Sequence, residues 1–281
     1  LETMSQRLCP TDYIDKYSLN LIKGQTLEIE TFITKLIKIG YRRVATVMEQ
    51  GEFSIKGALI DLYPMGTKLP YRIDLFDNEI DSIRTFDANS QRSIEVINSI
   101  YLLPAREFAS DHESISTFKS NYLSEFGNTN GFIYDEVNEG RFPGGIEFYL
   151  PLFFEQTSSL FDFFNNEPII AYRKGLDEEM KIQSNELLER FEHCQNSLER
   201  LPLEINKVFL NHEQFFKELK DKKQVQIQAS KLEQKAALNF SSSILPPLKI
   251  EAQTKKPLNK LINFIENFDG KVLIVCESEG R

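Results

Sequence analysis

The sequence predicts a multidomain chain of the α/β and α+β classes, and three of its segments indicate this. Residues 26–39 have the apolar spacing of an amphipathic helix, and short runs of β-branched and aromatic residues follow up to Tyr101. Helix and strand patterns then alternate over residues 104–228. A segment without apolar periodicity separates these from a last helix pattern, which leads into an apolar run. The 281 residues suffice for about two domains.

The first module is expected at residues 26–103 and combines one helix with an antiparallel sheet. The helix should end at Gly40, because glycine readily adopts the left-handed conformation that ends many helices. The apolar positions at near-helical spacing are Leu27, Phe32, Leu36, Ile37 and Ile39. Turn signals that separate the expected strands lie at Gln50-Gly51, Pro64-Met65-Gly66 and Asp77-Asn78.

One expected strand of this module, at residues 71–76, carries an aromatic residue among charges. Successive side chains of a strand point to opposite faces. One face therefore holds Tyr71, Ile73 and Leu75, and the other holds Arg72, Asp74 and Phe76. Two interpretations of Phe76 remain open: its ring packs on a neighbouring strand or an aliphatic stem, or it anchors a partner protein beside Arg72.

The second region, residues 104–228, has the pattern of part of an α/β lobe. Residues 111–141 are predicted to be helical, with a forced turn at 142–145. The run at 146–154 is so apolar that we expect it in a core or an interface. A buried strand is predicted at Ile169–Tyr172, and a helix from about Leu176 to Leu201. The apolar side of that helix would hold Met180, Leu187, Leu188 and Phe191.

A linker is predicted at residues 229–256, because this segment has serine and proline clusters and no apolar periodicity. A new unit is expected at 257–281, with Pro257 at a helix start and a buried strand at Val272–Cys276. The apolar face of its helix would hold Leu258, Leu261, Ile262 and Ile265. The sequence stops where that strand should lead into another element, so we expect a piece of a longer protein.

Composition narrows the function classes. The formal net charge of −9 argues against binding nucleic acid by bulk electrostatics, so weak DNA binding is expected. No apolar run approaches the roughly 18 residues of a membrane span, and a soluble cytoplasmic protein is expected. Cys9, Cys194 and Cys276 are too far apart for a metal motif, and we expect them to be reduced and mostly buried.

Nucleotide chemistry has no motif in this sequence. The pair Gly270-Lys271 lacks the first glycine of a phosphate-binding loop, since Ile265 stands there. The acid pairs Asp135-Glu136 and Asp177-Glu178 fall in expected helices, whereas Arg173-Lys174 follow the expected strand at Ile169–Tyr172, where magnesium would need a carboxylate. The row Asp77, Glu79 and Asp81 lacks the glycine and the glutamate of a calcium loop, and a hairpin is expected instead. The chain is therefore predicted to have no catalytic, cofactor or metal site.

Four stretches of the sequence resemble the N-terminal region of bacterial transcription-repair coupling factors, the Mfd family. They are GEFSIKGALIDLYPMGTKLPYRIDLFDNEIDSIRTFDANSQRS at residues 51–93, LLPAREF at 102–108, GGIEFYLPLFF at 144–154 and FDGKVLIVCESEGR at 268–281. The region is also similar to the excision-repair helicase UvrB, and the last stretch favours the coupling factors.

The resemblance implies a degenerate RecA-like lobe, of the P-loop NTPase class, that is interrupted by an inserted UvrA-binding domain. The expected parts are the end of the first half of the lobe at 1–25, the inserted α+β domain at 26–103, the second half at 104–228, the linker at 229–256 and the start of a further α/β domain at 257–281.

The resemblance also implies the partners and the binding residues. UvrA would bind this chain at the positions that match Lys56, Arg72 and Phe76, and many relatives carry arginine where Lys56 stands. The whole protein would also engage RNA polymerase and double-stranded DNA, with ATP and magnesium bound outside this monomeric segment. Two functions compete: an adaptor that recruits UvrA to lesions where polymerase has stalled, and a segment of an active UvrB-type helicase or ATPase.

Overall fold

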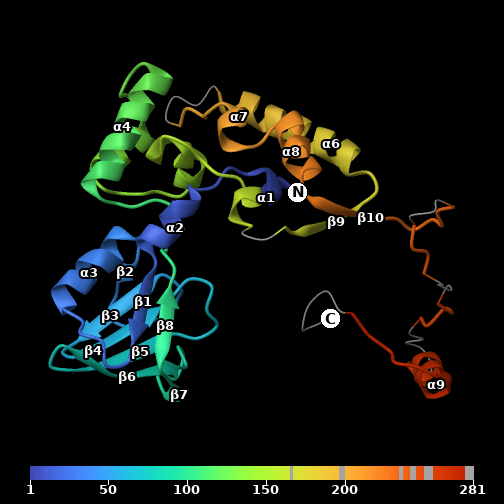
Figure 1. Cartoon of the computed structure of the whole chain (residues 1–281), viewed down its shortest axis with the longest axis horizontal. Coiled ribbons are helices and arrows are strands. Elements are labelled where there is room, and N and C mark those ends of the chain that lie inside the picture. The colour runs from blue at the N-terminus through green and yellow to red at the C-terminus, as the bar shows by residue number, and fades with distance from the viewer. Residues whose placement is uncertain (165–166, 196–199, 234–236, 241–244, 250–255, 276–281) are drawn as a thin grey trace. The chain divides into compact units, whose positions relative to one another are not determined.

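The computed structural model describes residues 1–164, 167–195, 200–233, 237–240, 245–249 and 256–275 (Figure 1). The chain divides into two compact units, Leu1–Ile227 and Gln228–Arg281. The first unit contains a sheet-rich module and a mainly helical part, so the mixed α/β composition expected from the sequence is confirmed. None of the helices in the described part of the chain combines the length and apolar character needed to cross a membrane.

The module is built on a six-stranded sheet with the order β2-β3-β4-β5-β6-β7. Its strands are β2 (Arg42–Arg43), β3 (Glu52–Lys56), β4 (Leu59–Tyr63), β5 (Tyr71–Phe76), β6 (Glu79–Phe86) and β7 (Ser93–Ile97). The short β2 runs parallel to β3, and every other neighbouring pair is antiparallel. The predicted antiparallel sheet is therefore confirmed, and so is the hairpin at Asp77-Asn78, which joins β5 to β6.

A second, two-stranded sheet closes the module. It pairs β1 (Leu19–Ile22) antiparallel with β8 (Ser99–Leu102). Leu21, Ile100 and Leu102 join the same buried core as the six-stranded sheet. Strand β1 thus packs with the module although it precedes residue 26, the start expected from the sequence.

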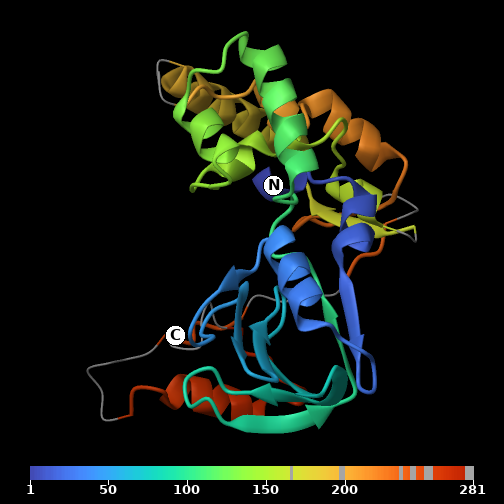
Figure 2. The ribbon, with the colours of Figure 1, turned by 90° about the vertical axis from the view of Figure 1, so that its left-hand side faces the viewer.

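Helix α3 (Ile29–Lys38) covers one face of the six-stranded sheet, as the mid-blue helix in Figure 2 shows. The helix predicted at residues 26–39 is confirmed. The core between helix and sheet includes Phe32, Leu36, Phe53, Ile60, Ile73 and Ile83. Ile37 differs from the prediction, because it is exposed rather than part of this apolar face.

The C-terminal end of α3 is fixed by the segment that follows the module. Gly40 has φ +94°, and a Cβ atom there would lie 2.6 Å from Cγ of Arg106, so this position requires glycine. The amide of Ala105 donates to the carbonyl of Ile39 at 2.9 Å. Lys38 Nζ lies 2.7 Å from Asp111 Oδ2. The C-terminal end of α3 therefore has a backbone hydrogen bond and an ion pair with the segment at residues 105–111, which follows the module.

The rest of the first unit is mainly helical. Its helices are α1 (Glu2–Ser5), α2 (Thr11–Tyr17), α4 (His112–Phe126), α5 (Phe132–Asn138), the 3-10 helices η1 (Ile146–Phe153) and η2 (Leu160–Phe163), α6 (Leu176–Cys194), α7 (Ile205–Val208) and α8 (His212–Lys220). The helical region predicted at 111–141 is confirmed as two helices, and Gly127 ends the first with φ +69°. Five of the eight residues of η1 are buried, so the core position predicted for 146–154 is also confirmed.

Two strands of this helical part, β9 (Ile169–Arg173) and β10 (Lys223–Ile227), form a parallel pair. The strand predicted at Ile169–Tyr172 is confirmed, but its predicted burial is wrong, since Ile169 is 68% exposed. The following helix ends at Cys194 rather than Leu201, and Leu188 is exposed on it. The apolar run at residues 169–172 predicted the strand conformation of β9 correctly. Its burial could not be predicted from that run, because burial depends on which other segments pack against the strand.

The second unit contains α9 (Asn259–Asn267), which confirms the helix predicted after Pro257. Residues 271–275 have no strand, so the prediction of a strand at Val272–Cys276 is wrong for its described part, and Cys276 lies outside the described residues. The described residues between 228 and 256 contain neither helix nor strand.

Candidate partner-binding surface

The strand register defines a face of the six-stranded sheet opposite α3, here called the outer face. Ile73 of β5 pairs with Ile60 of β4 and Ile83 of β6, and all three are buried under α3. Arg72, one residue earlier, must point to the outer face. The strand alternation predicted for residues 71–76 is confirmed, since Ile73 and Leu75 are buried while Phe76 is not.

Phe76 lies at the end of β5, before the turn at Asp77, and its side chain is 75% exposed. The interpretation that its ring packs on a neighbouring strand or an aliphatic stem is therefore wrong for the described residues. Removing a large apolar side chain from water lowers the free energy of the system, so an exposed ring of this size can stabilise contact with a partner surface. The second interpretation, an anchor for a partner protein, stays a prediction.

Arg72 has a different environment. Its Nε donates to Asp61 Oδ1 at 2.7 Å, and its Nη2 donates to Asp61 Oδ2 at 3.0 Å. Its Nη1 donates to the carbonyl of Gln91 at 3.1 Å, and the guanidinium lies over the ring of Phe86, 4.6 Å from the ring centroid. The side chain is only 17% exposed. The hydrogen bonds with Asp61 raise the pKa of Arg72, so its charge is permanent.

Lys56 is the last residue of β3 and is exposed. It pairs with Leu59 of β4, which pairs with Asp74 of β5. Neighbouring strands lie about 4.8 Å apart, so Lys56 and Asp74 are separated by roughly 10 Å across the sheet. Lys56 thus shares one end of the outer face with Phe76, while Arg72 lies further along β5, about 13 Å from Phe76.

Sequence reasoning missed the partners of these residues. Arg84 of β6 stands opposite Arg72 in the register, and its Nη2 lies 2.5 Å from Asp74 Oδ2. Asp61 is buried beneath Arg72. One signal was present: Asp61 is a single acid within the apolar run LIDLY, and a buried acid needs a cationic or hydrogen-bonding partner.

Two loops, at residues 44–50 and 87–92, lie on the outer face beside Arg72. In the loop at residues 44–50, the amides of Met48 and Glu49 donate to Glu52 Oε2 at 2.9 and 3.0 Å. Arg42 Nη2 donates to the other carboxylate oxygen of Glu52 at 2.6 Å. Burial alone would raise the pKa of Glu52, but these amide and guanidinium hydrogen bonds outweigh burial and lower it. The second loop contains Gln91, the acceptor of the Arg72 hydrogen bond.

The acid pairs considered for magnesium have structural partners. Asp135-Glu136 lie in α5, where Glu136 pairs with Arg141 at 2.5 Å. Asp177-Glu178 open α6, and Asp177 Oδ1 lies 2.7 Å from His212 Nε2. Both helical placements predicted from the sequence are confirmed. Among the described residues, no cluster of histidine, cysteine and carboxylate side chains could hold a metal ion.

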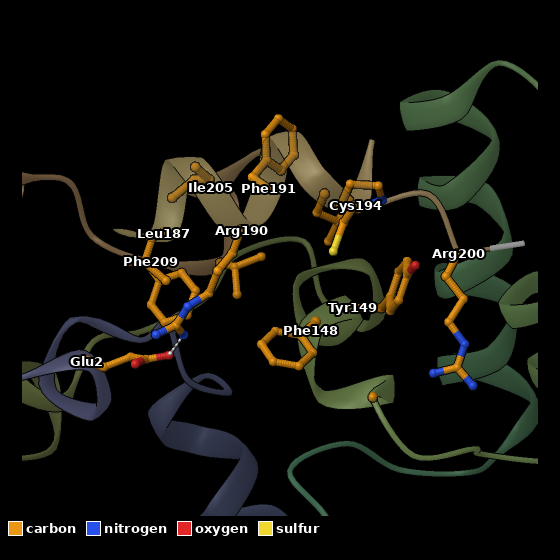
Figure 3. Close-up of a pocket in the computed structure, with 14 residues that line it drawn as sticks. Glu2, Phe148, Tyr149, Leu187, Arg190, Phe191, Cys194, Arg200, Ile205 and Phe209 are labelled. Carbon is orange, nitrogen blue, oxygen red and sulfur yellow. Dashed lines mark hydrogen bonds and ion pairs between the residues drawn. The ribbon is translucent and has the colours of Figure 1, made fainter. Parts of the chain in front are cut away.

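A cavity of about 340 Å³ lies in the helical part, between η1, α6 and the segment that contains α7. Figure 3 shows apolar side chains, among them Phe148, Leu187 and Phe209, around the opening. At one side, Arg190 Nη1 lies 3.2 Å from Glu2 Oε1, so these two charges pair with each other. The described residues that line the cavity are mostly apolar.

The sheet-rich module is of a recognised class: residues 19–108 match the family model of the UvrB interaction domain. This range begins at β1 and ends after β8, so it contains both sheets. Lys56, Arg72 and Phe76 all fall within it.

Whole-chain similarity extends further. The chain is 40% identical to the transcription-repair-coupling factor of Escherichia coli K12 over 285 aligned positions, which cover 100% of this chain and 25% of that protein. It is 36% identical to that of Haemophilus influenzae over the same shares. The Bacillus subtilis protein is 32% identical over 64% of this chain and 16% of its own length. The chain belongs to the transcription-repair-coupling factor family and spans about a quarter of the length of the first two relatives.

Proposed function

We propose that this chain is the segment of a transcription-repair coupling factor that recruits UvrA to DNA lesions where RNA polymerase has stalled. The ring of Phe76, 75% exposed on the outer face of the UvrB interaction domain, carries this proposal. An exposed aromatic residue among charges has the composition of the centre of a protein interface. Lys56 lies at the same end and would attract an acidic surface of UvrA.

For the whole protein we propose an ATP-dependent DNA translocase that displaces the polymerase, with RNA polymerase and double-stranded DNA as further partners. Residues 1–25 and 104–228 would be two parts of a degenerate RecA-like lobe, followed by a linker and a further α/β domain from residue 257. The parallel pair β9-β10 with helices between its strands supports this, because parallel strands joined by helices build such lobes. This segment would act as a cytoplasmic monomer without a nucleotide or metal of its own.

The alternative, a segment of an active UvrB-type helicase or ATPase, fits the chain less well. An active lobe needs a carboxylate at the end of a strand to hold magnesium. Arg173 ends β9 and Lys174 follows it, and two positive charges there would repel the ion. Asp177, the first acid that follows them in the sequence, is paired with His212 at the start of α6.

Titration calorimetry of the chain against purified UvrA tests the proposal. Phe76→Ala should weaken binding by about 2 kcal/mol or more, because it removes a central apolar contact. Lys56→Ala should weaken it less, since a charge at the rim mainly affects the association rate and the salt dependence. Arg72→Glu should also weaken binding by about 2 kcal/mol, but it places a second carboxylate beside Asp61 and so does not test a direct contact.

Tyr101→Ala is the matched control. Tyr101 is an aromatic residue of the same module, 55% exposed on β8, outside the six-stranded sheet. This variant should bind UvrA like the parent chain. Unchanged binding of Phe76→Ala, or equal losses for Phe76→Ala and Tyr101→Ala, would contradict the proposed surface.

A further inference from the structure

The cavity in the helical part has the size and the lining of a site for a small molecule. An apolar cavity of about 150 Å³ already binds benzene, and ligand pockets span about 300–1,000 Å³. The volume of about 340 Å³ lies within that range. Aromatic residues of η1 and α6, Phe148 and Phe191 among them, form its walls together with apolar residues of the segment at 202–209. This space corresponds to roughly one fused pair of rings.

The floor of the cavity belongs to the core of the helical part, so the space is formed by the fold itself. Tyr149 and Leu203 line the cavity and are buried in that core. The Tyr149 hydroxyl donates to the carbonyl of Leu201 at 2.7 Å, which ties η1 to the segment before α7. Arg200 Nη1 donates to the carbonyl of Gly144 at 2.9 Å, just before η1. A ligand would therefore enter a preformed site, which avoids the cost of ordering its walls.

The mouth of the cavity leaves apolar surface in contact with water. The side chain of Phe148 is 50% exposed, and Leu187 and Phe191 on α6 are only partly buried. Figure 3 shows these three side chains around the opening. A ligand with an apolar body would cover them, and removal of apolar surface from water favours such binding.

The charged residues of the lining favour an anion. Among the described residues they are two arginines and one glutamate, Arg190, Arg200 and Glu2, in a chain with a formal net charge of −9. Arg190 Nη1 donates to Glu2 Oε1 at 3.2 Å, the one side-chain hydrogen bond of Arg190 in the described part of the chain. A guanidinium has five N–H donors, and an exposed ion pair of this kind stabilises little. Arg190 can therefore bind a second carboxylate.

We propose that this cavity binds a small anion with an apolar body, of the class of aromatic or short-chain carboxylic acids. The body would fill the space between Phe148 and Phe191, and the carboxylate would accept from the remaining donors of Arg190. The walls come from α1, η1, α6 and the segment at 200–209, so they surround one compact molecule rather than follow an extended partner helix. The inference is independent of UvrA binding, because the cavity lies outside residues 19–108.

Fluorescence titration with 2-naphthoate, a fused-ring carboxylate, provides the first test. The chain contains no tryptophan, so the emission of the naphthyl ring is observed without overlap from that residue. We expect one saturable site. 2-Naphthamide has the same rings but no charge, and it should bind about tenfold more weakly because it lacks the charge-assisted hydrogen bond. Phe148→Ala should weaken the binding of both compounds about fivefold, because apolar contact surface is lost.

Substitutions of the two partners in one ion pair should have opposite effects. Arg190→Gln should weaken the binding of 2-naphthoate about tenfold, since it removes the cation. Glu2→Gln should strengthen it about threefold, since it removes the competing carboxylate. A purely structural role of this ion pair would make both variants bind more weakly. Arg84→Gln is the matched control, because it breaks an arginine ion pair with Asp74 in the sheet-rich module and should leave the affinity unchanged.

Cys194 provides a second readout at the cavity itself. It lines the cavity and is exposed, whereas Cys9 is buried elsewhere. In a Cys276→Ser background, saturating 2-naphthoate should slow the alkylation of Cys194 by the neutral reagent iodoacetamide about threefold or more, because the bound molecule limits access to the thiol. 2-Naphthoate should give no such protection in the Arg190→Gln variant at the same concentration.

Three results would overturn the inference: no saturable binding of 2-naphthoate, binding that Phe148→Ala and Arg190→Gln both leave unchanged, or binding without protection of Cys194. The first would leave the apolar walls to a protein partner. The other two would mean adventitious binding of the rings elsewhere on the surface. Equal affinities for 2-naphthoate and 2-naphthamide would overturn the assignment to anions.

Discussion

Ile73 and Phe76 lie three residues apart in β5 and have opposite environments: Ile73 is fully buried beneath α3, and Phe76 is 75% exposed on the outer face. An odd separation along a strand places two side chains on opposite faces of the sheet. One face of the strand therefore contributes to the core, and the other face is open to solvent at Phe76.

The first prediction compares these two residues. Ile73→Ala should lower the free energy of unfolding by about 2–5 kcal/mol, because it leaves a cavity in the core. Phe76→Ala should change it by less than about 0.5 kcal/mol, as for other exposed positions. Urea unfolding followed by circular dichroism measures both. A loss above about 1 kcal/mol for Phe76→Ala would show that the ring packs in solution.

The second prediction concerns thiol reactivity. Cys9 is buried, and burial, followed by the negative charge of Glu107, raises its pKa to about 12. The thiolate is the reactive form, so Cys9 should resist modification at neutral pH. Cys194 is exposed at the end of α6, so the expected burial is wrong for this cysteine, while Cys276 lies outside the described residues. In a Cys276→Ser background, Ellman's reagent should modify one thiol rapidly and the second only after unfolding.

The control for this experiment is the Cys194→Ser change in the same background. It should abolish the rapid phase and leave the slow one. Two rapidly modified thiols in the folded Cys276→Ser chain would contradict the burial of Cys9.

Features set by local pattern could be predicted from the sequence. The apolar spacing of α3, the alternation in β5 and the acids at the start of α6 each depend on neighbours within a few residues. The same alternation placed Phe76 on the face opposite Ile73 and Leu75, but it did not decide whether the ring packs on a neighbour or lies exposed. These signals require no knowledge of which strands pair.

Features set by long-range pairing could not be predicted. The Asp61–Arg72 ion pair depends on the register between β4 and β5, and residues 64–70 connect these strands without fixing that register. Strand β1 pairs with β8, whose residues lie far along the chain, so the sequence pattern placed the start of the module too late to include it. The exposure of β9 likewise depends on which segments pack against it, and no local spacing reports this.

The third prediction is that the chain neither binds nor hydrolyses ATP. Arg173 and Lys174 place two positive charges at the end of β9. In addition, the amide of Lys174 donates to the carbonyl of Ile227 at 3.0 Å, so this amide is not available to bind a phosphate. We expect no binding of a fluorescent ATP analogue in the presence of magnesium, and phosphate release equal to that of buffer. Magnesium-dependent turnover that Asp177→Asn or Glu136→Gln abolishes would contradict this prediction and favour the ATPase alternative.

The last prediction concerns acid stability and Glu52. The pKa of this carboxyl is lowered in the folded chain, because the amides of Met48 and Glu49 and the guanidinium of Arg42 together outweigh its burial. A carboxyl with a lowered folded pKa stabilises the folded state above its unfolded pKa of about 4.3. That contribution is lost as the pH falls through the folded pKa, when the carboxylate gains a proton and its ion pair disappears.

Glu52→Gln should therefore be less stable than the parent at pH 7, by about 1–3 kcal/mol, because an uncharged amide replaces a buried acceptor of three hydrogen bonds. The difference should shrink between about pH 5 and pH 3, as the parent loses its own advantage. Glu95→Gln, an exposed change on β7, serves as the control and should differ little from the parent in stability. Urea unfolding from pH 3 to pH 7 measures all three proteins. Parallel stability curves for the parent and Glu52→Gln would mean that Glu52 is not held as a buried carboxylate, and that the loop at residues 44–50 does not depend on its charge.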